Sequence, residues 1–293
     1  MRIGINTFLF ACPFHDRHTK LFSKFRKWGY DSVELAPASP ADIDPTYLRA
    51  QLDKHGLVAG SICAAMGPGR DLRGTSAEQK ESLSYLKAMI GQMEILGATV
   101  LAGPLYSTVG RADAETDAAK RQQWKLVKGH LRDLAVYAGD RGVTLGIEPL
   151  NRFETDFINT CDQALEMVAD VNHPALKVHL DTFHMNIEEK DLGQAIRRCG
   201  KQLCLLHASG TDRGTPGKDH TDWSSIASAL KAIKYQGDVV IESFTQDVKI
   251  IARAAAIWRR LEPTQDEIAK AGIKFLRRAL NPEAGCDSPL KTR

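Results

Sequence analysis

Residues 142–148 read GVTLGIE, a short run of apolar and β-branched residues that opens on a glycine and ends on a glutamate. Similar runs recur along the whole chain. Between them lie longer stretches, such as 76–96 and 113–141, whose apolar residues are spaced three and four apart as in amphipathic helices. This alternation is typical of βα units and a parallel sheet. The eight apolar runs lie near residues 2–6, 31–35, 57–63, 98–103, 142–148, 175–181, 202–207 and 237–242.

Glycines mark the points where several of the preceding helices are expected to end. Gly29, Gly56, Gly97 and Gly142 each stand just before an apolar run, and glycine accepts the left-handed conformation that terminates a helix. Eight parallel strands could form an open doubly wound sheet, whose nucleotide-binding versions carry GxGxxG after the first strand. Here the first run leads into Asn-Thr-Phe at 6–8 instead. A closed (β/α)8 TIM barrel of the α/β class is therefore favoured.

The length of 293 residues suits one such barrel as a single domain. No linker or low-complexity stretch interrupts the series of runs. We expect a domain over 1–280, with additional C-terminal helices from about 246 to 280. Residues 281–293 are expected to form a flexible tail.

Composition and charge exclude several classes of partner. Hydrophobic residues make up 43% and charged residues 26%, and 39 basic against 36 acidic residues give a net charge of +3 without a Lys/Arg cluster. Nucleic-acid binding is thus not indicated. The six cysteines form no CxxC pair, and the apolar start of the chain is too short for a membrane span and poor as a signal peptide. A cytoplasmic location without a membrane partner is expected.

Four consecutive runs end on a potential metal ligand: Glu148, Asp181, His207 and Glu242. The C-terminal strand ends of a barrel converge on the active site. Taken singly, an acidic residue there is more often a helix cap or an ion-pair partner, and a histidine a hydrogen-bonded core residue. Together, three carboxylates and one imidazole suit Mn²⁺, Mg²⁺ or Co²⁺ better than a structural zinc. The pattern predicts one divalent metal ion, with Mn²⁺ as the first choice.

The segments around these residues resemble the ketose 3-epimerases of the D-tagatose, D-allulose (psicose) and L-ribulose 3-epimerase type, within the xylose-isomerase-like barrels. The resemblance covers residues 1 to about 280. It lies in four motifs: IEPLNRFETDFINT (147–160), VHLDTFHMNIEE (178–189), LLHASGTDRGTPGKDHTDW (205–223) and VVIESF (239–244).

The resemblance implies roles for particular residues. Glu148, Asp181, His207 and Glu242 would bind the metal, and the two glutamates would also form the catalytic acid/base pair. The substrate-binding residues would be Glu154, His184 and Arg213 around the reacting end of the sugar, with Cys63 and Phe244 as pocket walls. Without the resemblance, the first three would be read as surface residues and the last two as core residues. Homodimers or homotetramers are also implied.

Two N-terminal segments match the family less well. The loop at 8–18 has no clear counterpart, and its His15 and His18 are expected to be solvated although they resemble metal ligands. The segment GPLYSTVG (103–110) is similar to the loop that binds the far end of the sugar in the family. Differences there leave the identity of the ketose open.

The expected reaction is metal-dependent epimerisation at C3 of a free ketose such as D-allulose, D-tagatose or L-ribulose, through an enediolate. An aldose-ketose or hydroxypyruvate-type isomerase would use the same site and is the main alternative. A phosphorylated substrate is not favoured, because ESFTQDV (242–248) lacks the Gly-rich loop that often binds phosphate there.

Two further alternatives come from other functional classes. An apurinic-site endonuclease-like barrel would need several metals and extra histidines, and the third and fourth runs end in SICAAMG and LAGPLYS without any. A metal-free sugar-binding protein would contain no stoichiometric metal.

Overall fold

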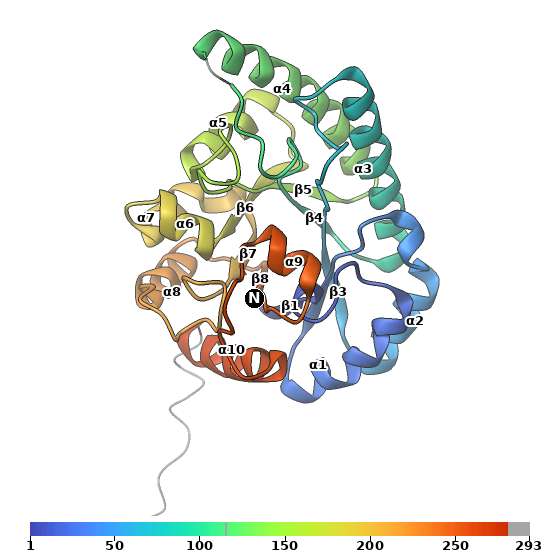
Figure 1. The fold of residues 1–293 in the computed structure, drawn as a ribbon, viewed down its shortest axis with the longest axis vertical. Coiled ribbons are helices and arrows are strands. Elements are labelled where there is room, and N and C mark those ends of the chain that lie inside the picture. Colours follow the sequence, from blue (N-terminus) through green and yellow to red (C-terminus); the bar gives the residue numbers. More distant parts are fainter. Residues whose placement is uncertain (115, 281–293) are drawn as a thin grey trace, which may run out of the picture.

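The computed structural model describes residues 1–114 and 116–280. Its eight strands form a closed barrel in chain order, and each strand is parallel to both neighbours. Helices surround this barrel (Figure 1), which confirms the expected (β/α)8 fold. The strands are β1 Arg2–Asn6, β2 Ser32–Leu35, β3 Val58–Cys63, β4 Val100–Gly103, β5 Thr144–Ile147, β6 Leu176–Asp181, β7 Leu203–Ala208 and β8 Asp238–Ile241.

The helices follow the predicted spacing, with short additions at the loops. The α-helices are α1 Phe22–Trp28, α2 Pro45–His55, α3 Ser76–Leu96, α4 Asp117–Gly139, α5 Cys161–Val171, α6 Thr182–Glu188, α7 Leu192–Cys199, α8 Trp223–Ala232, α9 Lys249–Ala254 and α10 Gln265–Leu280. The 3-10 helices are η1 Thr7–Leu9, η2 Asp16–Leu21, η3 Pro40–Asp42 and η4 Gly200–Gln202. The sequence analysis did not predict α6, although it ended the preceding run at residue 181, where β6 ends.

Glycine ends three of the helices as predicted. Gly29, Gly56 and Gly97 are left-handed caps of α1, α2 and α3. Gly142 also has a positive φ of 68°, but α4 already ends at Gly139 with a right-handed cap residue. Gly142 therefore shapes the turn into β5 and does not cap the helix.

The barrel interior has an apolar lower layer and a polar upper layer. Ala102, Leu205 and Val240 form a small buried cluster inside the barrel, while most of the buried apolar residues belong to one large cluster that includes inner faces of the surrounding helices. At the C-terminal ends of the strands the interior becomes polar, with buried residues such as Glu34 and His207. This polar layer is where barrel enzymes place their active sites.

The strand register has two irregularities. Between β2 and β3, Val33 pairs with Ala59 but Glu34 pairs with Ser61, so Gly60 is skipped. Between β6 and β7, Val178 pairs with Leu203 but His179 pairs with Leu205. An extra residue in one strand changes the direction in which the following side chains point.

The C-terminal part of the domain consists of two helices separated by the segment 255–264. Ala252 of α9 packs with Phe244, which follows β8, and with Phe8, which follows β1. The helix α9 thus covers part of the barrel mouth, and α10 lies at the outer edge between α1 and α8 (Figure 1). The tail predicted for 281–293 lies outside the described residues. Within the described part of the chain, no helix is long and apolar enough to cross a membrane.

Candidate metal centre

Four side chains meet at the top of the barrel, as the sequence predicted. Asp181 and His207 lie in β6 and β7, and Glu148 and Glu242 follow directly after β5 and β8. One ligand atom of each lies within 4.8 Å of those of the other three, and all four residues are buried. Three carboxylates and an imidazole at this density need a positive partner, because unpaired buried charges are costly. The donor set fits a divalent cation of the Mn²⁺ or Mg²⁺ kind.

The two glutamates have very different electrostatic surroundings. Burial raises the pKa of Glu148 well above its usual value, and the negative charges of Glu242 and Asp181 add to the effect. Burial acts in the same direction on Glu242, but His207 and Arg213 outweigh it and lower the pKa of that carboxyl to about 2. One glutamate therefore favours the protonated state and the other the ionised state.

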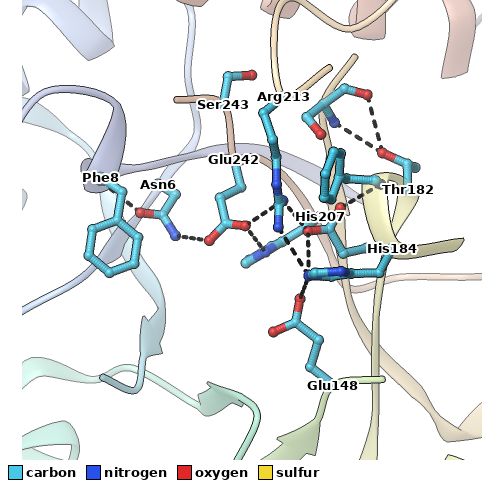
Figure 2. A network of polar contacts seen from close by, with 12 residues as sticks. Asn6, Phe8, Glu148, Thr182, His184, His207, Arg213, Glu242 and Ser243 are labelled. Carbon is cyan, nitrogen blue, oxygen red and sulfur yellow. Dashed lines mark hydrogen bonds and ion pairs between the residues drawn. The ribbon is translucent and has the colours of Figure 1, made fainter. Parts of the chain in front are cut away.

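Arg213 supplies positive charge inside the cluster. Its Nη1 donates to Asp181 and, at 2.9 Å, to Glu242 Oε2. Figure 2 shows the guanidinium between Glu242 and His184. The rings of Phe183 and Phe244 lie 4.1 and 4.8 Å from its Cζ, and the backbone adopts a φ of 67°, which is uncommon for a non-glycine residue. Contacts on several sides thus fix this side chain in the site.

His184 lies on the short helix α6, one turn beyond the strand. Its Nδ1 accepts a hydrogen bond from the backbone N–H of Asn151 at 3.0 Å, and Arg213 Nη2 lies 3.0 Å from its Nε2. That nitrogen lies 3.7 Å from Glu148 Oε1 and faces the cluster. Burial lowers the pKa of His184 to about 3, and Arg213 contributes. The ring is therefore neutral and contacts Arg213 at the edge of the site.

The other residues predicted to bind substrate also lie near the cluster. Asn151 Nδ2 donates to Glu154 Oε1 at 2.9 Å, and burial raises the pKa of this carboxyl. The Cys63 thiol lies within 4.8 Å of carboxylate oxygens of Glu34 and Glu242. Phe244 contacts Arg213 as described. The structure therefore gathers all five predicted substrate-binding positions around the same centre.

Sequence reasoning missed a group of buried polar residues below His207. Glu34 is fully buried, and its Oε1 lies 2.7 Å from His207 Nε2. Asn6 Nδ2 donates to Glu34 at 2.6 Å and to Glu242 at 3.1 Å, and Ser61 Oγ also donates to Glu34. A carboxylate of this kind fixes the orientation and tautomer of a metal-binding histidine. The sequence did offer one sign of this group, because Glu34 is a charged residue inside the otherwise apolar run DSVEL (31–35).

His179 is a second buried residue that the sequence did not reveal. Its side chain is fully buried, and its ring lies 4.1 Å from that of His207, centroid to centroid. His179 and Asp181 are two residues apart on β6, so they point to the same side of the strand. Period-two spacing from Asp181 would have placed His179 in the barrel interior.

The two N-terminal histidines lie apart from the centre. His18 Nδ1 accepts the backbone N–H of His15 at 3.0 Å, and His15 Nδ1 lies 3.5 Å from Asp42. Both side chains are half-buried, not freely solvated as expected. They belong to no ligand cluster among the described residues.

The segment 103–110 donates hydrogen bonds to the backbone of two site residues. Tyr106 Oη donates to the carbonyl of Glu148 at 2.7 Å, and Gly110 N–H donates to the carbonyl of Glu154 at 2.7 Å. The loop after β4 therefore helps to fix the backbone of two site residues.

Comparisons with known proteins agree with this arrangement. A model of the xylose isomerase-like TIM barrel family matches residues 22–279. A probable ketose 3-epimerase from Synechocystis sp. is 34% identical over 279 residues, which are 94% of this chain and 96% of that protein. A solved structure of an L-ribulose 3-epimerase has a TM-score of 0.89 at 30% identity and covers 100% of this chain and 99% of its own. The structure of D-allulose 3-epimerase from Methylomonas sp. in complex with D-allulose has a TM-score of 0.89 at 26% identity, over 95% and 97% of the two chains.

Proposed function

We propose a function for this chain from one premise: it belongs to the ketose 3-epimerase family, within the xylose isomerase-like TIM barrels. The proposed activity is metal-dependent epimerisation at C3 of a free ketose. The observation that carries the proposal is the buried cluster of Glu148, Asp181, His207 and Glu242 with Arg213 and His184 beside it.

The four clustered residues would hold one divalent cation, Mn²⁺ in the first place, with Mg²⁺ or Co²⁺ as alternatives. Their oxygen-rich donor set and their density of buried negative charge fit such an ion. A bound dication supplies stabilisation of the negative charge that develops on two adjacent substrate oxygens in the enediolate. Glu34 would contact Nε2 of His207 and so hold the imidazole in the orientation that binds the metal.

Glu148 and Glu242 are the proposed proton carriers. In the scheme, one carboxylate takes the proton from C3, and the other returns a proton to the opposite face of the flat intermediate. This needs one ionised and one protonated group at the start. The opposite pKa shifts of the two carboxyls support such a division. The configuration of the ketose at C3 decides which glutamate acts first.

Arg213, His184 and Glu154 are proposed to bind the oxygens at the reacting end of the sugar. Arg213 presents N–H donors toward the cluster, and the neutral ring of His184 lies beside it, which suits the oxygen atoms of a carbonyl and its adjacent hydroxyls. Cys63 and Phe244 would form pocket walls. The loop at 103–110 is the proposed contact with the far end of the sugar.

The test is an assay of the metal-reconstituted protein against D-allulose, D-tagatose, L-ribulose and related free ketoses, with chromatographic separation of products. A C3 epimer as product supports the proposal. An aldose as the main product would identify the chain as an isomerase. Purified protein that contains no stoichiometric metal, and that binds sugar without converting it both before and after chelation, would point to a sugar-binding protein.

A homodimer or homotetramer and a cytoplasmic location remain predictions from the sequence. Size-exclusion chromatography with light scattering tests the first, and fractionation of the producing cell tests the second.

A further inference from the structure

The starting observation is a buried histidine without partners. Neither ring nitrogen of His179 has a hydrogen bond among the described residues, although the side chain is fully buried. Buried polar groups are nearly always satisfied, so an exception calls for a ligand, a water or an ion. The proposed epimerase scheme gives His179 no task.

The backbone around His179 has two unusual features, a register shift and a neighbouring glycine. The register of β6 and β7 shifts between Val178 and His179. On the other side of β6, a Cβ at Gly146 would lie 3.2 Å from the Cβ of His179 and 2.9 Å from Cys204 Sγ. Any larger residue at 146 would press against His179 and Cys204. Gly146 therefore lets His179 and Cys204 keep their positions.

His179 points toward two of the four clustered residues. Its Nδ1 lies 3.7 Å from Glu148 Oε2, and ligand atoms of Glu148, His179 and His207 all lie within 4.8 Å of one another. In a tetrahedral zinc site with bonds of about 2.0 to 2.1 Å, neighbouring ligand atoms are about 3.3 to 3.5 Å apart. Changes of up to about 1.5 Å in the separations of these atoms would bring them to that spacing.

We infer that Glu148, His179 and His207 form a second metal-binding set, selective for Zn²⁺, that overlaps the four-residue set. Two imidazoles and one carboxylate are a donor set that zinc takes with an open fourth position, whereas Mn²⁺ and Mg²⁺ prefer oxygen ligands. The four-residue set offers three carboxylates and one imidazole. The same cluster thus presents an oxygen-rich set and a nitrogen-rich set.

The two sets exclude each other. Both use Glu148 and His207, and Nε2 of His207 faces Glu34 Oε1 at 2.7 Å. A histidine with one nitrogen engaged has one left for a metal. Zinc in the nitrogen-rich set therefore withdraws two ligands from the oxygen-rich set, so zinc inhibits and manganese reverses the inhibition.

The first experiment measures binding and does not depend on catalysis. Chelator-stripped full-length protein is titrated with Zn²⁺ and with Mn²⁺, as wild type, His179→Gln and the control His130→Gln. His130 lies on α4 and contacts Gln79, away from the cluster. His179→Gln is expected to weaken Zn²⁺ binding at least about tenfold with little change for Mn²⁺, and His130→Gln is expected to change neither.

X-ray absorption of the zinc-loaded proteins identifies the ligands directly. Two imidazoles are expected in the wild type and one in His179→Gln. A single imidazole in the wild type, or equal Zn²⁺ affinity in both proteins, overturns the inference. Circular dichroism shows whether the variant is folded. If it is not, the imidazole count in the wild type still decides.

The second experiment rests on the proposed function. In the manganese-loaded enzyme, added Zn²⁺ is expected to inhibit epimerisation competitively with Mn²⁺, and His179→Gln should need about tenfold more zinc for the same loss. Equal sensitivity would overturn the inference. A protein without epimerase activity would contradict the proposed function, while the binding and absorption results would still test the zinc set.

Discussion

Glu148 and Glu242 are both buried at the top of the barrel, yet their surroundings drive their proton affinities apart. Replacing either by glutamine removes the proton carrier and keeps nearly the same shape. We expect Glu148→Gln and Glu242→Gln each to lower kcat by about 10²- to 10⁴-fold, the usual contribution of a general acid or base. Steady-state kinetics on the metal-loaded proteins measures this effect.

Circular dichroism spectra that match the wild type would serve as the control for folding. Metal content must be measured in parallel, because each glutamate is also a proposed ligand. Near-normal epimerase activity in either variant would refute the two-carboxylate scheme.

His184 links the site to the pH dependence of stability. Its folded-state pKa of about 3 lies below the ordinary value of 6.5, so the unfolded chain binds the proton more readily. Stability from this group is complete above about pH 6.5 and is lost as the pH falls toward 3. The loss amounts to roughly 4 to 5 kcal/mol. Denaturant unfolding of the metal-free protein between these pH values should show it.

The variant His184→Gln provides the comparison for that measurement. It should unfold with a flatter pH profile over the same range, since it has no proton to take up at this position. An identical slope in both proteins would mean that other groups control the acid response.

At the scale of elements, an ion pair of the buried Arg73 with the partly exposed Asp156 joins two loops above the barrel. Arg73, in the loop before α3, is buried, and its Nη2 donates to Asp156 at 2.6 Å in the loop that carries Glu154. Its Cζ also lies 4.7 Å from the ring of Phe157. The loop after β3 therefore helps to position the loop after β5.

We expect Arg73→Met to raise KM for the ketose, because the loop that carries Glu154 loses its anchor. It should also lower the free energy of unfolding by about 2 kcal/mol, because a charge-assisted hydrogen bond to the partly exposed Asp156 is lost. Kinetics and urea unfolding on the same preparation measure both effects.

A matched control lies two residues further along. Thr75 caps α3, and its Oγ1 accepts the N–H of Glu78. Thr75→Ala should lower stability by about 1 kcal/mol and leave KM unchanged. If both variants change KM equally, the kinetic effect reflects lost stability and not the position of the loop.

At the scale of the whole molecule, the proposed metal couples the function to the fold. The cluster draws residues from the C-terminal ends of β5, β6, β7 and β8 or directly after them, so a bound dication would connect half of the barrel. At a concentration of 100 times its Kd, a ligand specific for the folded state adds about 2.7 kcal/mol of stability.

Chelation should therefore lower the midpoint of thermal unfolding, and added Mn²⁺ should restore it together with activity. Calorimetry on stripped and reloaded protein measures the change. A protein whose midpoint and activity are both unaffected by chelation would not be a metalloenzyme.

The amino-acid sequence alone determined the barrel and its four clustered side chains. Glu148, Asp181, His207 and Glu242 each follow an apolar run, and parallel strands of a barrel bring their C-terminal ends to one edge. The end of each apolar run can be recognised from that segment alone, so these four positions can be predicted without coordinates. The positions of Arg213, His184 and Glu154 near the centre came from the resemblance of the flanking motifs.

Only the tertiary structure decided what lies beneath that edge. Glu34 and His179 each follow a register shift between neighbouring strands, and such a shift depends on a partner strand that is distant in sequence. Whether Glu34 meets His207, and whether His179 meets Glu148, is set by closure of the barrel and not by either strand alone. Side-chain contacts across a closed sheet are long-range, which is why the sequence predicted the four clustered residues and only the structure revealed the residues that support them.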